Sequence, residues 1–252
     1  MCMFSRVVAS VADTSIFARS SAGGRQFLVY SMKYSADSDL AMILPLPTPP
    51  SPPEDAVRFI DLSLYPRFFE DMAKGFNFPV TRSRAARAAL GGRPTLKVHE
   101  VGSFQASFVP RLQDFGRLDK RFRLPEQTWE QLPQYSDYAF AVFKLQAGAK
   151  NVHPMAFEFP RSEPRELFFP TVHVHEGAVS AYADFDHSLY LQTPRARAGM
   201  SVSTADGFSP WTAGQFMDVG RTQGIVDAES VVQKWRLKGL RANTDIFVEE
   251  KM

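Results

Sequence analysis

The chain has 252 residues, of which 44% are hydrophobic and 22% are charged, with a formal net charge of +2. This length suits one large core or two modest ones, and the weak net charge argues against a nucleic-acid partner. No stretch approaches the ~18 consecutive apolar residues of a membrane span, and the N-terminus lacks the apolar core of a signal peptide. The single cysteine, Cys2, excludes an internal disulfide, so we expect a cytoplasmic protein with no membrane association.

Alternating apolar residues predict two strands at the N-terminus, over residues 4–19 and 25–34, joined by a turn at Gly23 and Gly24. Both faces of the second strand carry apolar side chains, so we expect both to be covered. A third apolar strand starts at residue 40 and runs into the proline-rich tract 45–53. Proline cannot donate to a strand ladder, so this strand should stop or lie at an edge. The tract is either a stiff connector or a contact for a protein partner.

Residues 54–76 place apolar residues at helical spacing and predict two short helices on either side of Pro66. The basic loop 82–93 follows, with arginines among small residues. It is either a flexible loop or a docking patch for an acidic protein partner.

A second block begins at residue 95. It predicts a strand pair over 95–110, a short helix over 111–122, and another that begins at residue 126 and stops near Pro133. Strands are predicted over 139–146, 152–160, 167–177 and 181–192. The fold class is therefore α+β and sheet-dominated, with mostly antiparallel strands and a few short helices. We expect one domain over residues 1–200, with sub-blocks 1–80 and 94–200 joined by the basic loop. Residues 201–252 should form a loop-rich C-terminal extension that packs on it.

Three stretches carry a resemblance to a known family: "LAMILPLPTPP", "VHEVGSFQASFVPRLQDFGRL" with the downstream "LPQYSDYAFAVFKL", and "HPMAFEFPRSEPRELFFPT". In this order they resemble blocks of the bacterial domain-of-unknown-function family 2330, over roughly residues 5–175. The relatives carry signal peptides and more cysteines, whereas this chain begins at Met1 and has only Cys2. The resemblance implies a fold and a bacterial source, and no activity.

Four of the five histidines fall within one region: His153, His173, His175 and His187. On an extended strand, residues two apart share a face, so His173 and His175 should project in parallel. Two imidazoles and a third ligand from His153 or His187 would suit zinc, copper or iron. The alternative is that the histidines lie on a solvated or hydrogen-bonded face of a sheet. If Phe185 is a core residue, His187 also points inward.

Cys2 offers a second chemistry. Removal of Met1 would leave a free α-amine beside a thiol, as in N-terminal nucleophile hydrolases. The stretch "SIFARS", with Arg19, resembles the opening of penicillin V acylase and bile-salt hydrolase relatives, although serines stand where their next aspartate is expected. The alternative is that Cys2 is simply a small residue at the start of a strand.

These patterns favour a binding or interaction protein of unknown function over an enzyme with a recognisable mechanism. A histidine-lined metal site is the first chemical hypothesis, and a Cys2 amide hydrolase is the second. A scaffold component of a protein assembly, held through the proline-rich tract and the basic loop, is the third.

Overall fold

A computed structural model describes residues 3–76, 99–101, 104–151, 153–174, 177–193 and 207–250 of the chain. For residues 99–101 and 149–151 only the backbone is described. No helix in these ranges is both long and apolar enough to pass through a membrane.

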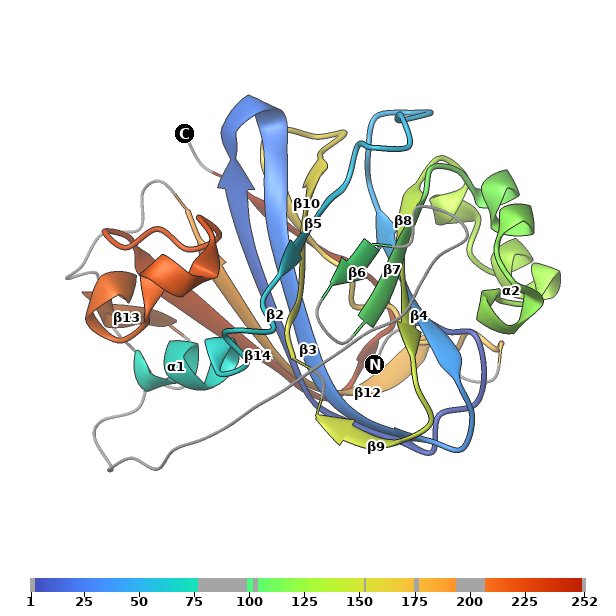
Figure 1. The fold of residues 1–252 in the computed structure, drawn as a ribbon, viewed down its shortest axis with the longest axis horizontal. Helices are drawn as coiled ribbons and strands as arrows, with labels where there is room; N and C mark the ends of the chain where they lie inside the picture. The colour runs from blue at the N-terminus through green and yellow to red at the C-terminus, as the bar shows by residue number, and fades with distance from the viewer. Residues whose placement is uncertain are drawn as a thin grey trace.

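Two β-sheets pack face to face, and helices and loops cover the outer face of each (Figure 1). The larger sheet has the strand order β13 (Gly207–Thr212), β14 (Val231–Ala242), β12 (Tyr182–Gln192), β2 (Ser10–Ser21), β3 (Arg25–Ala36), β10 (Met155–Pro160) and β5 (Arg58–Asp61), and β9 (Gly148–Asn151) also pairs with β3. The smaller sheet has the order β1 (Met3–Phe4), β4 (Leu40–Leu46), β8 (Ala139–Leu145), β7 (Phe104–Val109) and β6 (His99–Val101). A separate pair joins β11 (Glu166–Phe169) to β15 (Ile246–Glu249).

Among these named strands only β2 and β12 pair in parallel, and the rest pair antiparallel. The predicted fold class, sheet-dominated α+β with a few short helices, is confirmed. The helices are α1 (Phe68–Lys74) and α2 (Glu126–Glu130). Short 3₁₀ segments lie at Ala22–Gly24, Leu112–Arg117, Lys120–Phe122, Pro133–Tyr135, Ala213–Gln215 and Val219–Thr222.

Three apolar clusters follow from this layering. The first fills the space between the sheets and includes Leu28 and Tyr30 of β3. The second lies between the larger sheet and α1, where Val29 of β3 meets Phe68 and Met72. The third lies between the smaller sheet and the segments around α2. Strand β3 is thus buried on both faces, as its two-sided apolar pattern predicted.

Two backbone features of the N-terminal half agree with the sequence. Gly23 and Gly24 adopt φ values of 69° and 70°, a left-handed conformation that suits glycine, and they turn β2 into β3. Strand β4 includes Pro45, which lies opposite Phe140 of β8. On its other side β4 pairs with β1 only at Met42 and Ile43. Pro45, which has no N–H to donate, therefore lies where β4 has no second strand partner among the described residues.

The structure corrects the first of the two predicted helices in residues 54–76. Residues 58–61 form the edge strand β5, and Leu64, which we placed on an apolar stripe, is 83% exposed. A short apolar run fits a helix or a strand equally well, and pairing with β10 decided for the strand. The second predicted helix is confirmed as α1. Residues 111–122 form 3₁₀ segments in place of the predicted helix.

The C-terminal residues also differ from the expectation of a loop-rich extension. Strand β14 pairs with β12 along ten residues, and β13 pairs with β14. The polar side chains of β14 hid this strand, because half of its residues face solvent. Residue 200, where we placed the domain boundary, lies outside the described residues, and the boundary stays a prediction.

The chain after β14 is held to the body of the protein by buried polar contacts. Arg161 and Glu250 form an ion pair with Nη1–Oε2 at 2.5 Å, and both side chains are at most 10% exposed. The carboxylate of Asp245 accepts hydrogen bonds from Tyr135 Oη at 2.5 Å and from the amides of Thr171 and Val172 at 2.7 and 3.0 Å. We call residues 243–250 the C-terminal arm.

Candidate functional site

A cleft of about 730 Å³ opens between the edges of the two sheets. One wall is formed by the outer edge of β5 and the residues leading into it, including Val57 and Phe59. The opposite wall is formed by Ser107–Val109, the part of β7 that lies beyond its pairing with β6. Within the described part of the chain, neither stretch has a strand partner on the side of the cleft. We call this space the β5/β7 cleft.

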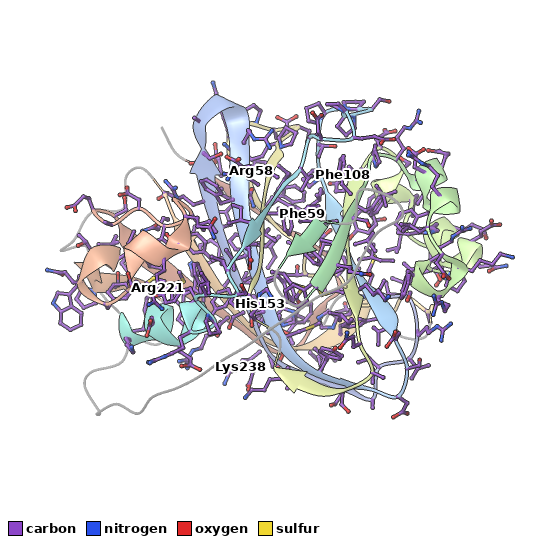
Figure 2. The ribbon with its side chains drawn as sticks, viewed as in Figure 1. Arg58, Phe59, Phe108, His153, Arg221 and Lys238 are labelled. Atoms are coloured by element: carbon purple, nitrogen blue, oxygen red, sulfur yellow. The ribbon has the colours of Figure 1, made fainter. Side chains whose placement is uncertain are left out.

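Apolar side chains line the inner part of the cleft. Phe59 and Phe108 pack against the central core from opposite walls, and Val57 and Val109 are 4% and 3% exposed. The ring of Phe59 meets Phe143 of β8 edge to face, with centroids 5.8 Å apart. Figure 2 shows Phe59 and Phe108 between the two sheets. This lining suits an apolar ligand surface.

Charged side chains form the rim of the cleft. Arg117 Nη1 lies 2.5 Å from Glu54 Oε1 across the mouth, and Arg111 Nε lies 3.0 Å from Asp114 Oδ2. Both side chains of the Arg117–Glu54 pair are exposed, so this pair adds little to stability.

The rim has a different structure on the β5 side. Arg58 of β5 belongs to a row of side chains that lie in register across four strands. Arg19 of β2 lies opposite Phe27 of β3, Phe27 lies opposite Glu158 of β10, and Glu158 lies opposite Arg58 of β5. Residues directly opposite each other in a sheet share a face. The guanidinium groups of Arg19 and Arg58 lie 5.1 and 5.9 Å from the centre of the Phe27 ring. We call this set the Arg19–Arg58 row.

Glu158 is the acidic member of the row. Its Oε2 lies 3.0 Å from Arg58 Nε and 3.6 Å from Arg25 Nε, and its Oε1 accepts a hydrogen bond from Ser21 at 2.5 Å. Burial opposes ionisation of Glu158, but the hydrogen bond from Ser21 and the charge of Arg58 outweigh it and lower its pKa. Arg25 and Arg58 therefore both contact one carboxylate, and Arg19 lies two strands further along the row.

No local pattern in the sequence indicates this site. Residues 54–61 read as a helix, and the members of the row are separated by up to 139 positions along the chain. The apolar pair Phe59 and Ile60 is the one local signal for β5, and it is too short to be decisive.

The structure brings together two of the four predicted metal ligands. The rings of His173 and His187 stack with centroids 5.2 Å apart, and Phe185 packs beside both. Phe185 and His187 are 4% and 1% exposed, so the expectation that His187 points inward with Phe185 is confirmed. Burial lowers the pKa of His187 to about 2, and the adjacent His173 acts in the same direction.

His173 is not on a regular strand. The strand predicted over 167–177 ends at Phe169, and Val174 forms only an isolated bridge to Met3. The side chain of Asn243, in the C-terminal arm, takes the place of a neighbouring strand. It accepts a hydrogen bond from the His173 amide at 2.7 Å and donates one to the His173 carbonyl at 2.8 Å. Parallel projection of the histidine pair is therefore not enforced by strand geometry.

His153 lies apart from this pair and packs on Phe104, with ring centroids 4.1 Å apart. Within the described residues, no three His, Cys, Asp or Glu side chains are placed to hold one metal ion. His175 lies outside the described residues, so the predicted metal site stays a prediction.

Of the two residues of the predicted hydrolase, the structure describes only Arg19. Arg19 Nε and Nη2 donate to the carbonyls of Ile225 and Gly224 at 2.7 and 2.5 Å, which ties β2 to the C-terminal loop. Cys2 lies outside the described residues, so its role as a nucleophile stays a prediction.

The arrangement defines the class of fold as a two-sheet α+β sandwich with helices on its outer faces. No protein-family model matches this chain, and no curated protein does. The resemblance to family 2330 therefore stays a prediction.

Solved structures of one viral protein share the fold. Baculovirus P35 is similar at a TM-score of 0.51 and 14% identity, over 97% of this chain and 99% of that chain. Mutated P35 after caspase cleavage gives a TM-score of 0.52 and 13% identity, over 95% and 100%. P35 in the caspase-8/P35 complex is similar at a TM-score of 0.50 and 12% identity, over 95% of this chain and 96% of that chain. At these identities the likeness establishes the fold alone.

Proposed function

We propose that this chain is a protein-interaction module whose partner is a protease. The observation that carries this proposal is the likeness along nearly the whole chain to P35, a protein seen both in complex with caspase-8 and after caspase cleavage. The β5/β7 cleft supports the proposal independently, because its open strand edges and apolar lining suit a polypeptide better than a small polar molecule.

The proline-rich tract 45–53 is the first of two contact segments. Its inner part is buried, with Pro45 and Pro47 covered, whereas Pro49 and Pro50 are exposed. The tract leads directly to Glu54 on the rim of the cleft. A partner that covers these exposed prolines would therefore also reach the β5/β7 cleft.

The basic loop 82–93 is the second contact segment, and it lies outside the described residues. The basic loop is part of the stretch 77–98, which contains four arginines and one lysine but no aspartate or glutamate. A protease that acted on this segment would need an acidic or neutral substrate pocket, by charge complementarity.

The test is to mix the full chain with caspase-8 and, separately, with a cysteine protease whose substrate pocket is acidic. Size-exclusion chromatography reports a complex, and intact-mass analysis reports cleavage. We expect a complex with at least one enzyme. Absence of both complex and cleavage with either enzyme would contradict the proposal.

Two variants assign the contact. Replacement of the four arginines of the basic loop by glutamine should weaken the complex if that loop is the contact, and Pro49→Ala with Pro50→Ala should do so if the proline-rich tract is. Lys238→Gln, a charge change on an exposed strand at the opposite end of the larger sheet, is the matched control.

A further inference from the structure

The outer edge of β5 is the place where the larger sheet can accept another strand. Strand β10 pairs with the inner edge of β5, and β6 of the other sheet lies near β5. Val57–Phe59 is the stretch that lines the cleft. A polypeptide in extended form next to Val57–Phe59 would gain main-chain hydrogen bonds, as in strand addition.

The Arg19–Arg58 row specifies the side chain that such a polypeptide should carry. A residue directly opposite Arg58 shares the face of Arg58, and the order along the row is Arg19, Phe27, Glu158 and Arg58. The Arg58 side chain is 54% exposed, and its Nε is the atom that binds Glu158. The guanidinium leans toward the Phe27 ring and still keeps an exposed side, so an acidic side chain in the next position of the row would meet an accessible cation and extend the alternation of charge.

The neighbours of that acidic residue would point to the other face of the sheet. Val57 and Phe59 lie on that face and belong to the central apolar layer, and Phe108 approaches from the opposite wall of the cleft. Apolar side chains on both sides of the acidic one would meet these three residues.

We propose that the β5/β7 cleft binds an extended segment of a partner protein with the pattern apolar–acidic–apolar, its acidic side chain paired with Arg58. This site is additional to the contacts through the proline-rich tract and the basic loop. A second copy of this chain is disfavoured as the occupant, because a two-fold pairing centred on Val57–Phe59 would bring Arg58 opposite Arg58. A nucleic acid is disfavoured because Glu54, Asp55 and Asp114 lie on the same rim.

The experiment measures binding of the full chain to fluorescent seven-residue peptides, blocked at both ends, by anisotropy. The central three residues are Val-Asp-Val in the probe, and Val-Asn-Val and Val-Lys-Val in the matched peptides. We expect the aspartate peptide to bind about tenfold more tightly than the asparagine peptide, and the lysine peptide to bind more weakly still. The preference should shrink as salt is raised.

Variants place the peptide. Arg58→Gln should remove the preference for aspartate over asparagine, Arg58→Lys should keep part of it, and Phe108→Ala should weaken all three peptides. Lys238→Gln, at the opposite edge of the larger sheet, should change nothing. Figure 2 shows Arg58 beside β5 and Lys238 well away from it.

Equal binding of the three peptides, or no binding of any of them to the natural chain, would overturn the proposal even if the Arg58 variants failed to fold. Sedimentation of the natural chain at the same concentrations tests whether two copies of the chain pair through the cleft. A dimer that Arg58→Gln disrupts, without peptide binding, would make the cleft a contact between copies and would also overturn it. Each of these outcomes is distinct from failure to bind a protease.

Discussion

Among the described residues, both ends of the larger sheet leave an edge without a strand partner, but the two edges are built differently. At one end, β14 runs beyond β13, which covers it only as far as Lys234. There Gly239 adopts a φ of 74°, and Arg241 Nε donates to the Lys238 carbonyl of the same strand at 3.1 Å. At the other end, β5 is short, stays in register with β10, and lines a cleft with apolar walls.

This difference shows that an unpaired edge is not in itself a docking site. Two features interrupt the outer edge of β14: the left-handed Gly239, and the Lys238 carbonyl, which already accepts a hydrogen bond from Arg241. Such features protect exposed strands from pairing with other chains. The β5 edge has a neighbouring wall, an ordered charge pattern and apolar contacts within reach. Its protection comes instead from its short length.

The C-terminal arm secures the β14 end, and breaking its buried ion pair should have the largest effect. Arg161→Met leaves Glu250 buried without its cation, which should lower the free energy of unfolding by about 3–5 kcal/mol. Urea titration measures the change. The double variant Arg161→Met with Glu250→Leu should recover part of the loss, and a change below about 1 kcal/mol in the single variant would contradict the role of this pair.

Asp245 is the second residue that attaches the C-terminal arm, and its carboxyl group should make the free energy of unfolding depend on pH. Enclosure of its carboxylate by protein atoms raises its pKa to about 6, against the hydrogen bonds from Tyr135, Val172 and Thr171. Because this value lies above the unfolded value of about 3.9, the stability linked to Asp245 is present below about pH 4 and is lost as the pH rises through about 6.

Asp245→Asn keeps the shape and removes the titration. Relative to this variant, the natural chain should lose on the order of 2 kcal/mol of unfolding free energy between about pH 4 and pH 6. Chemical unfolding at several pH values measures the difference. Parallel pH profiles for the two proteins would mean that Asp245 does not titrate in this range.

A smaller effect should come from the left-handed glycine of β14, Gly239. Gly239→Ala places a side chain at a left-handed position and should cost roughly 1 kcal/mol. Gly116→Ala is the control, since that glycine has open space and no left-handed φ. Thermal unfolding compares the two variants, and equal midpoints would show that the left-handed conformation at position 239 does not require glycine.

The smallest effect should come from the rim of the β5/β7 cleft. Arg117→Gln removes the exposed pair with Glu54, and the thermal midpoint should stay within the error of the measurement. Binding of the aspartate peptide should also persist, because Arg58 and not Arg117 lies in the row. Loss of peptide binding in Arg117→Gln would move the recognition of the acidic residue to the other side of the cleft.

Local patterns in the sequence determined much of the framework. Alternation and a glycine pair predicted the β2–β3 hairpin, apolar residues on both sides predicted that β3 is covered on both faces, and the residues after Pro66 predicted α1. These signals depend on neighbours within a few positions, so one sequence is enough to read them.

Only the tertiary structure decided the candidate site. Arg19, Glu158 and Arg58 form one row because three separate strand pairings align them, and the cleft exists because β5 and β7 belong to different sheets. Register across a sheet depends on long-range pairing, which a period of two along one strand does not encode. The sequence by itself therefore determined the strands with a clear local pattern, such as β2 and β3, and which of their faces are apolar. The packing of distant strands determined which charged side chains meet at the edge of the sheet.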